Sequence, residues 1–266
     1  MPFDFHTDKS RYFSMQYETT RDYILPMLAP FLNIGPGLSV LEIGCAEAGV
    51  LKAFTEHGCQ CLGIELASNR LEWARKFMHE EAEAGLVSFR DQDIHKVDLE
   101  NDLTDRFDLV ILKDVIEHIH DQESFVRRLA EFLKPNGFIF YAFPPWYMPF
   151  GGHQQLADHK LLAKLPYVHL LPMPLYKTLL RAFGESETKV KNLAEIKETG
   201  ISIERFERLV RKAGFDIVAK KHFLFNPIYK YKFGIKPKQQ FALISALPFI
   251  RNFFTTGVYY LTQRKN

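Results

Sequence analysis

Residues 40–49, VLEIGCAEAG, constrain the fold more than any other part of the chain. Their first four residues favour a buried β-strand, and Gly44, Ala46 and Gly49 follow with the spacing G-x-A-x-x-G. A strand that leads through such a turn into a helix presents backbone N–H groups at the positive helix N-terminus, where a ligand can approach closely. This spacing alone fits a nicotinamide dinucleotide as well as other ligands.

The alternation of strand and helix continues through the first half of the chain. The sequence predicts strands at residues 39–43, 61–65, 87–91, 107–112 and 138–143, and helices at 49–57, 68–84 and 121–133. The last of these helices stops at Lys-Pro-Asn-Gly, residues 134–137. Such alternation indicates βαβ units and a parallel sheet with helices on both faces, and the apolar strands fit burial on both sides.

Acidic residues lie at the carboxyl ends of the first three predicted strands. A dinucleotide turn uses helix N–H groups to neutralise a pyrophosphate, so the carboxylate of Glu42 would repel that ligand. The same carboxylate suits a cationic ligand that carries an ammonium and a sulfonium group. Glu65 ends the second strand, where it can accept hydrogen bonds from ribose hydroxyls, and Asp93 is placed to read an adenine amino group.

Residues 40–49, 63–65, 91–94 and 107–137 together resemble the class I S-adenosylmethionine-dependent methyltransferases. The resemblance covers residues 38–145 and 200–263, and Ala46 departs from the glycine that is commoner at its position. It implies an α/β fold with a Rossmann-like, doubly wound, seven-stranded and mostly parallel sheet, whose last strand is antiparallel, with inserted lid segments. It also implies S-adenosylmethionine as the cofactor.

The resemblance further implies a role for each acidic strand end. Glu42 and the turn from Gly44 to Gly49 would hold the methionine end, Glu65 the ribose, and Asp93 with Ile94 the adenine. The full set of residues predicted to bind the cofactor is Tyr17, Glu42, Gly44, Cys45, Ala46, Gly49, Glu65, Leu66, Asp93, Ile94, Lys113 and Asp114.

The chain is expected to form a single domain, residues 1–266, with four parts. They are an aromatic N-terminal lid segment (1–33), a cofactor-binding half (34–145), a substrate or lid insertion (146–199) and a C-terminal part (200–266) with a basic insert at 226–252. In the C-terminal part the sequence predicts a helix at 201–213 and strands at 217–225 and 257–263. The leucines of the insertion fit either a lid or a dimer interface, and we favour the lid because methyl transfer benefits from the exclusion of water.

Asp114, Glu117 and His118 have a spacing that would place all three on one face of a helix. One interpretation is a capping box, with Asp114 as N-cap and Glu117 at the third helical position. A second makes His118 a general base. A third is a divalent cation site, since the spacing is similar to the Glu-x-x-Glu-His segment of ubiquinone-biosynthesis O-methyltransferases. We do not favour a resident metal, because Asp replaces the first Glu, but the cation site stays open.

Two further histidines follow the fifth predicted strand, at the sheet edge where α/β proteins bind ligands. Residues 143–147, Phe-Pro-Pro-Trp-Tyr, lead into a Gly-Gly pair and then His153, which could face the transferred methyl group. His159 is a lesser candidate. We predict His118 and His153 as the catalytic residues.

The last 50 residues contain nine Lys and Arg and no Asp or Glu. Lysines alternate with aromatic residues between residues 220 and 238, which fits water-facing strand lysines, contact with an anionic membrane surface, or binding of single-stranded nucleic acid. Because the whole chain has a net charge of only +2, we do not expect a nucleic acid partner. A homodimer stays open.

The sequence therefore predicts an enzyme, a methyltransferase that acts on the oxygen or nitrogen of a small molecule, which could be lipid-linked or anionic. An odd number of cysteines and no visible signal peptide lead us to expect the cytoplasm. Three alternatives stay open: a dehydrogenase, which Glu42 opposes; a methyltransferase of RNA or protein; and a binding protein that has this fold but no turnover.

Overall fold

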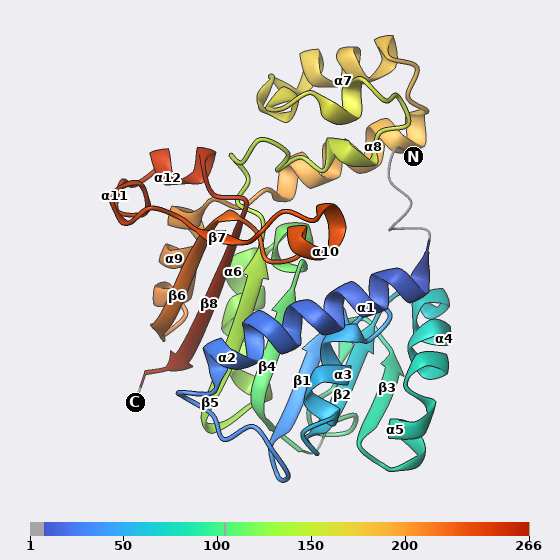
Figure 1. The fold of residues 1–266 in the computed structure, drawn as a ribbon, viewed down its shortest axis with the longest axis vertical. Coiled ribbons are helices and arrows are strands. Elements are labelled where there is room, and N and C mark those ends of the chain that lie inside the picture. Colours follow the sequence, from blue (N-terminus) through green and yellow to red (C-terminus); the bar gives the residue numbers. More distant parts are fainter. Residues whose placement is uncertain (1–7, 104, 266) are drawn as a thin grey trace.

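The computed structural model describes residues 8–103 and 105–265, and it has the predicted α/β fold (Figure 1). A single sheet of eight strands has the order β3-β2-β1-β4-β5-β8-β6-β7. Neighbours among β1 to β5 are parallel, whereas β8 is antiparallel to β5 and β6, and β7 to β6. The prediction of seven strands was one short, because the basic insert adds the two-residue β7 at the edge.

The boundaries of the elements follow the predicted alternation closely. The strands are β1 (Ser39–Ile43), β2 (Gln60–Glu65), β3 (Val87–Asp91), β4 (Phe107–Lys113), β5 (Leu133–Phe143), β6 (Phe215–Phe225), β7 (Lys238–Gln239) and β8 (Gly257–Arg264). The α-helices are α1 (Lys9–Thr19), α2 (Leu25–Leu28), α3 (Gly49–Thr55), α4 (Ser68–Phe77), α5 (His79–Glu83), α6 (Gln122–Arg128), α7 (Met173–Ala182), α8 (Glu187–Thr199), α9 (Ile203–Lys212), α10 (Tyr229–Phe233), α11 (Ala242–Ser245) and α12 (Ile250–Phe253).

Each face of the sheet carries its own apolar layer, because successive side chains of a strand point to opposite faces. On β1, Val40 belongs to the layer that includes Phe54 of α3, whereas Leu41 belongs to the layer that includes Phe206 of α9. Both layers are covered by helices, which explains why the strands are apolar at nearly every position.

Two predicted helices are interrupted in the structure. The helix predicted at residues 68–84 divides into α4 and α5 at Met78, whose backbone leaves the helical region while its side chain is fully buried. The helix predicted at 121–133 ends at Arg128, and a 3₁₀ turn leads directly into β5. The expected stop signal therefore lies inside β5, where Asn136 has a φ of +65° and the register with β4 shifts.

The N-terminal segment and the insertion lie at the carboxyl edge of the parallel strands (Figure 1). Helix α1 packs so tightly on α3 that a Cβ atom on Gly49 would lie 2.3 Å from the carbonyl oxygen of Phe13. Residues 146–199 form a lobe with a small apolar cluster of its own, built around Leu162, Tyr176 and Leu193. Among the described residues, no helix has the length and apolar character needed to cross a membrane.

Candidate active site

Two adjoining cavities lie at the carboxyl ends of β1 and β4. The smaller has a volume of about 50 Å³ and lies at the glycine turn, and the larger, about 340 Å³, lies between the sheet, the insertion and the C-terminal insert. Tyr12, Arg70, Lys113 and Asp114 line both. Seven of the predicted cofactor residues line the smaller cavity: Glu42, Gly44, Cys45, Ala46, Gly49, Lys113 and Asp114.

The turn after β1 has an unusual backbone. Gly44 has a φ of +72°, and a Cβ atom there would lie 2.7 Å from a methyl carbon of Val115. Ala46 and Ala48 have φ values of +52° and +68°. For a residue with a Cβ atom this left-handed conformation costs roughly 1–2 kcal/mol. Ala46 therefore adopts a backbone conformation that favours glycine, and such strain is typical of ligand-binding turns.

Glu42 is a buried carboxylate that the protein leaves incompletely compensated. Its side chain is 2% exposed, and its Oε2 atom has no hydrogen-bonding partner within the described residues. Burial raises the pKa of Glu42 well above its usual value, with Lys113 acting in the opposite direction. A cationic group that entered the smaller cavity would supply the missing partner.

Glu65 and Asp93 lie at the ends of β2 and β3, as predicted, and both orient the backbone. Glu65 accepts hydrogen bonds from the N–H groups of Ala46 and Ala67, at 2.9 and 3.0 Å. Asp93 accepts one from the N–H of His95 at 3.0 Å. Glu65 therefore ties the second strand end to the glycine turn of the first.

Other predicted cofactor residues lie outside the two cavities. Leu66 is exposed after β2, and Ile94 is buried after Asp93. The hydroxyl of Tyr17 donates to Glu56 at 2.8 Å, whereas Tyr12, more than one helical turn earlier, lines both cavities. The aromatic N-terminal segment thus reaches the site through a different tyrosine from the one that the sequence suggested.

Two ion pairs that the sequence did not predict connect the glycine turn to α1 and α4. Glu47 accepts from Arg70 at 3.1 Å and from Lys9 at 2.7 Å, so one turn carboxylate joins α4 and α1. Phe13 and Gln16 of α1 also line the smaller cavity. Glu47 stands out by its place in the turn, but no local pattern marks the α1 residues, which reach the site only through tertiary packing.

Asp114, Glu117 and His118 do not lie on one helical face, so the capping-box interpretation is wrong. Asp114 has a φ of +56° and accepts from Lys113 Nζ at 2.5 Å, and a 3₁₀ turn follows at Ile116–His118. The N-cap of α6 is Asp121, which accepts from the N–H of Ser124 at 3.1 Å.

Glu117, His118 and His153 converge instead. One ligand atom from each lies within 4.8 Å of the others, and the two imidazole rings are 5.2 Å apart. Glu117 is 4% exposed, neither of its carboxylate oxygens has a hydrogen-bonding partner within the described residues, and burial raises its pKa. His159 lies elsewhere, with its ring 4.8 Å from that of Phe183.

The C-terminal insert supplies a further wall of the larger cavity. Asn226, Tyr229 and Lys232 line it, the last two from α10. Burial lowers the pKa of Lys232 to about 8, and Asp114 acts in the opposite direction. The cavity therefore combines cationic side chains, Lys113 and Lys232, with the cluster of Glu117 and the histidines.

Comparison with known proteins agrees with this geometry. A family model described as a methyltransferase domain matches residues 14–220. Ubiquinone biosynthesis O-methyltransferases of Rhodopseudomonas palustris (strain BisB18) and Bradyrhizobium sp. (strain ORS 278) are 31% and 32% identical over 114 and 111 residues, or 43% and 42% of this chain. The matched part spans only 42% of each of these relatives.

Solved structures of methyltransferases share the fold at low sequence identity. One is geranyl diphosphate C-methyltransferase of Streptomyces coelicolor A3(2), solved in complex with Mg²⁺, geranyl diphosphate and S-adenosylhomocysteine. Its TM-score is 0.57 at 12% sequence identity, and the alignment covers 93% of this chain and 79% of that chain. Another is a phosphoethanolamine N-methyltransferase of Haemonchus contortus, solved in complex with phosphomonomethylethanolamine and S-adenosylhomocysteine. Its TM-score is 0.54 at 18% sequence identity, and the alignment covers 99% of this chain and 59% of that chain. The family model covers most of the chain, and the chain belongs to the methyltransferase-domain family.

Proposed function

We propose that the chain transfers a methyl group from S-adenosylmethionine to a small molecule. The observation that carries the proposal is Glu42, a buried and incompletely partnered carboxylate beneath a strained glycine turn. S-adenosylmethionine has an ammonium and a sulfonium group and can compensate that charge, whereas a pyrophosphate cannot. In this proposal Glu65 holds the ribose, and Asp93 with Leu66 and Ile94 holds the adenine.

The acceptor lies in the larger cavity, which three segments of the chain enclose. Its volume of about 340 Å³ is at the lower end of the range for small-molecule pockets, which supports a compact acceptor over a macromolecule. Lys113 and Lys232 line it, which supports an acceptor that bears an anionic group. The lobe of residues 146–199 acts as the lid that excludes water and aligns the acceptor with the sulfonium methyl.

The attacking atom is an oxygen in this proposal. A hydroxyl must lose its proton to become a good nucleophile, whereas a neutral amine already has a free electron pair. His118 and His153 line the cavity together, and burial lowers the pKa of His118, which keeps its imidazole neutral and able to accept a proton. The oxygen then attacks the methyl carbon in line, the sulfonium leaves as a neutral thioether, and the histidine pair retains the proton.

Glu117 favours a second version of this step, in which a divalent cation helps to ionise the acceptor. Its two unpartnered oxygens fit a cation, and two imidazoles with one carboxylate favour a transition metal such as Zn²⁺ over Mg²⁺. Glu117, His118 and His153 would hold the ion, and Asp114 would not, because it pairs with Lys113. When bound, such an ion lowers the pKa of an oxygen ligand.

Titration calorimetry with the full chain tests the cofactor proposal. We expect S-adenosylhomocysteine to bind and NAD to give no heat, and the reverse result would contradict the proposal. Equilibrium dialysis against Zn²⁺, Mn²⁺ and Mg²⁺, with Glu117→Gln as the control, separates the two versions of the deprotonation step. A methyltransferase of RNA or protein would instead be inhibited strongly by heparin at low salt.

We also propose that the protein works in the cytoplasm. Cys45, Cys59 and Cys61 are all buried free thiols, which supports a reducing compartment.

A further inference from the structure

Residues 241–254 present their apolar side chains to solvent and bury polar ones. Leu243 is 76% exposed and Phe249 68%, whereas Asn252 is fully buried and Arg251 nearly so. We call the large exposed apolar side chains of this segment the apolar cap; they are Phe241, Leu243, Leu247, Phe249, Ile250, Phe253 and Phe254. A segment that folded only to bury its own apolar groups would have the opposite pattern.

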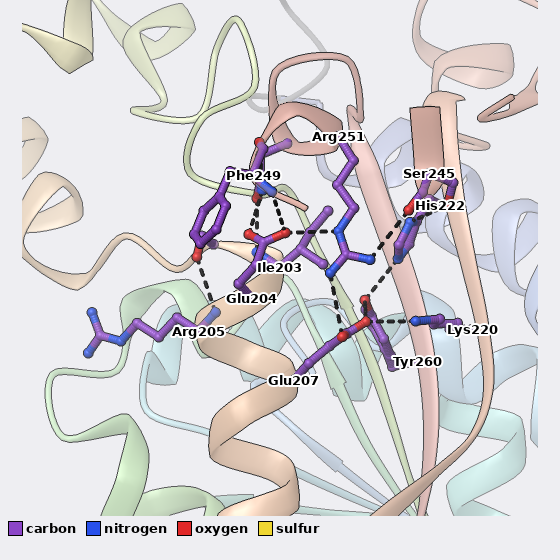
Figure 2. A network of polar contacts seen from close by, with 12 residues as sticks. Ile203, Glu204, Arg205, Glu207, Lys220, His222, Ser245, Phe249, Arg251 and Tyr260 are labelled. Atoms are coloured by element: carbon purple, nitrogen blue, oxygen red, sulfur yellow. Dashed lines mark hydrogen bonds and ion pairs between the residues drawn. The ribbon is translucent and has the colours of Figure 1, made fainter. Parts of the chain in front are cut away.

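A network of polar contacts fixes this inverted orientation (Figure 2). Glu204 of α9 accepts from Arg251 Nε at 2.9 Å and from Asn252 Nδ2 at 2.7 Å. It also accepts from the backbone N–H of Phe249 at 2.9 Å. Phe249 is held with a φ of +63°, a conformation that is rare for a bulky residue and that the contacts with Glu204 support.

The same network anchors the other half of the cap. His222 on β6 lies 2.8 Å from the hydroxyl of Ser245 and 2.8 Å from that of Tyr260, which donates to Glu207 at 2.9 Å. Arg251 Nη2 lies 3.4 Å from Glu207. Helices α11 and α12 are therefore both tied to the body of the protein (Figure 1), and the outward direction of the apolar side chains is built in.

A fixed apolar patch on a protein surface marks an interaction site, and the charge around it indicates the partner. Lys236 and Lys238 are exposed next to the cap, and Lys238 Nζ lies 4.5 Å from the ring centroid of Phe241. Two other lysines of this segment have internal partners, since Lys220 pairs with Glu207 and Lys230 with Asp22. Lys238 adjoins the apolar residues, and Lys236 lies two residues before it, a combination suited to an anionic membrane surface.

The charge pattern opposes a second copy of the chain as the partner. The last 50 residues have nine Lys and Arg and no acidic residue. A two-fold symmetric contact through the cap would place the same basic segment on both sides of the interface, and like charges would repel.

We propose that the apolar cap inserts into the headgroup region of an anionic membrane, with Lys236 and Lys238 at the level of the lipid phosphates. Because α10 both lines the larger cavity and leads into the cap, docking would hold that wall of the cavity at the lipid surface. This surface is separate from the catalytic chemistry, so a test of binding does not depend on the proposed function.

Vesicle flotation with the full chain tests the proposal. We expect flotation with vesicles of phosphatidylcholine and phosphatidylglycerol at a ratio of 7:3, and about tenfold weaker binding to pure phosphatidylcholine or in high salt. The double variant Leu243→Gln/Phe249→Asn should lose binding to the mixed vesicles by at least about tenfold. Phe31→Asn, which removes an exposed aromatic side chain far from the cap, is the matched control and should float like the unmodified chain.

Folding and oligomeric state are measured alongside. Asn tolerates the positive φ of position 249, so we expect thermal unfolding to show that the double variant is folded. If the double variant is not folded, the test passes to Lys236→Gln/Lys238→Gln, at exposed positions, which must lose binding to the mixed vesicles. The proposal is overturned if the unmodified chain does not float, or if folded cap variants float as well as Phe31→Asn. Light scattering that shows a dimer which the cap variants dissociate, without flotation, would assign the cap to a second copy instead.

Discussion

Two pairs of glutamates with little or no exposure to solvent have very different surroundings in this protein. Glu204 and Glu207, on α9, have several partners each: amide, guanidinium, ammonium and hydroxyl groups all donate to them (Figure 2). Glu42 and Glu117, at the two cavities, keep carboxylate oxygens without any partner among the described residues. Hydrogen bonds and ion pairs lower the pKa of the first pair despite burial, whereas burial raises the pKa of the second.

This difference in hydrogen-bonding partners indicates that Glu204 and Glu207 stabilise the fold, whereas Glu42 and Glu117 serve binding or catalysis. A buried carboxylate without a partner destabilises the folded state, whereas a carboxylate that accepts several hydrogen bonds can be buried at little cost. If the partners of Glu42 and Glu117 are a ligand and a cation, substitutions in the two pairs must have opposite consequences. Those at α9 should reduce stability, and those at the cavities should reduce binding or turnover and leave stability intact.

The largest effect should come from Glu207→Leu. It leaves Arg251 with Glu204 as its remaining carboxylate and removes the partner of Lys220, and breaking a buried ion pair in this way costs at most about 3–5 kcal/mol of unfolding free energy. Urea denaturation measures this loss. The control is Glu187→Gln, which breaks a solvent-exposed pair with Arg181 and should change the stability far less. Equal stability of the two variants would contradict a structural role for Glu207.

Glu117→Gln should lower turnover by about a hundredfold, the range typical of a lost acid–base or charge-stabilising group. It removes a buried carboxyl group whose oxygens have no partner within the described residues, so the unfolding free energy should stay the same or rise. Single-turnover kinetics with an identified acceptor and urea denaturation of the same preparation give both values. A destabilised variant with normal turnover would place Glu117 with the structural pair.

The sequence predicted Glu42 better than Glu117, for a physical reason. Glu42 is a carboxylate inside a continuous apolar strand, directly before a glycine turn, and the neighbouring residues alone show that this is unusual. Glu117 lies in a segment whose spacing also fits a helix start, and only the left-handed backbone of Asp114 removes that alternative. Lys232 and Tyr12 reach the cavities from opposite ends of the chain, so no local pattern could place them there.

The α/β class and the seven predicted strands were confirmed, and the errors lie where strand pairing or side-chain burial outweighs a local signal. Helix and strand alternation follows from apolar periodicity, which is local. The Pro-Asn-Gly segment at residues 135–137 signals a chain reversal, yet it forms an irregularity inside β5, because pairing with β4 continues on both sides of it. Likewise, burial of Met78 outweighs the helical propensity of its neighbours.

Glu42→Gln should weaken the binding of S-adenosylhomocysteine by about 1–3 kcal/mol, because the amide keeps the shape of the side chain but not its charge. That corresponds to roughly fivefold to 150-fold in the dissociation constant. Calorimetry measures the change, with Glu56→Gln, at the exposed end of α3, as the control. Unchanged affinity in Glu42→Gln would remove the charge of Glu42 from cofactor binding.

The smallest effect concerns pH and the structural pair. Burial, with Arg251 and Lys220 nearby, lowers the pKa of His222 from 6.5 to about 4, although Glu207 and Glu204 act in the opposite direction. In the unfolded chain the histidine takes up a proton near pH 6.5, and in the folded chain only near pH 4, so the folded state loses stability as the pH falls between these values. From pH 6.5 to 5 this amounts to about 1–2 kcal/mol.

His222→Gln isolates this contribution, because glutamine can hydrogen-bond but does not titrate in this range. Urea denaturation at pH 6.5 and pH 5 should show a smaller loss of stability in the variant than in the unmodified chain. Glu207 does not contribute to this difference between pH 6.5 and pH 5. Its pKa of about 2 means that the stability it contributes is lost only below about pH 4.5. Equal losses in both proteins would mean that His222 is already charged in the network. The network would then hold a further positive charge beside Arg251, and Glu204 and Glu207 would compensate His222 in addition to Arg251 and Lys220.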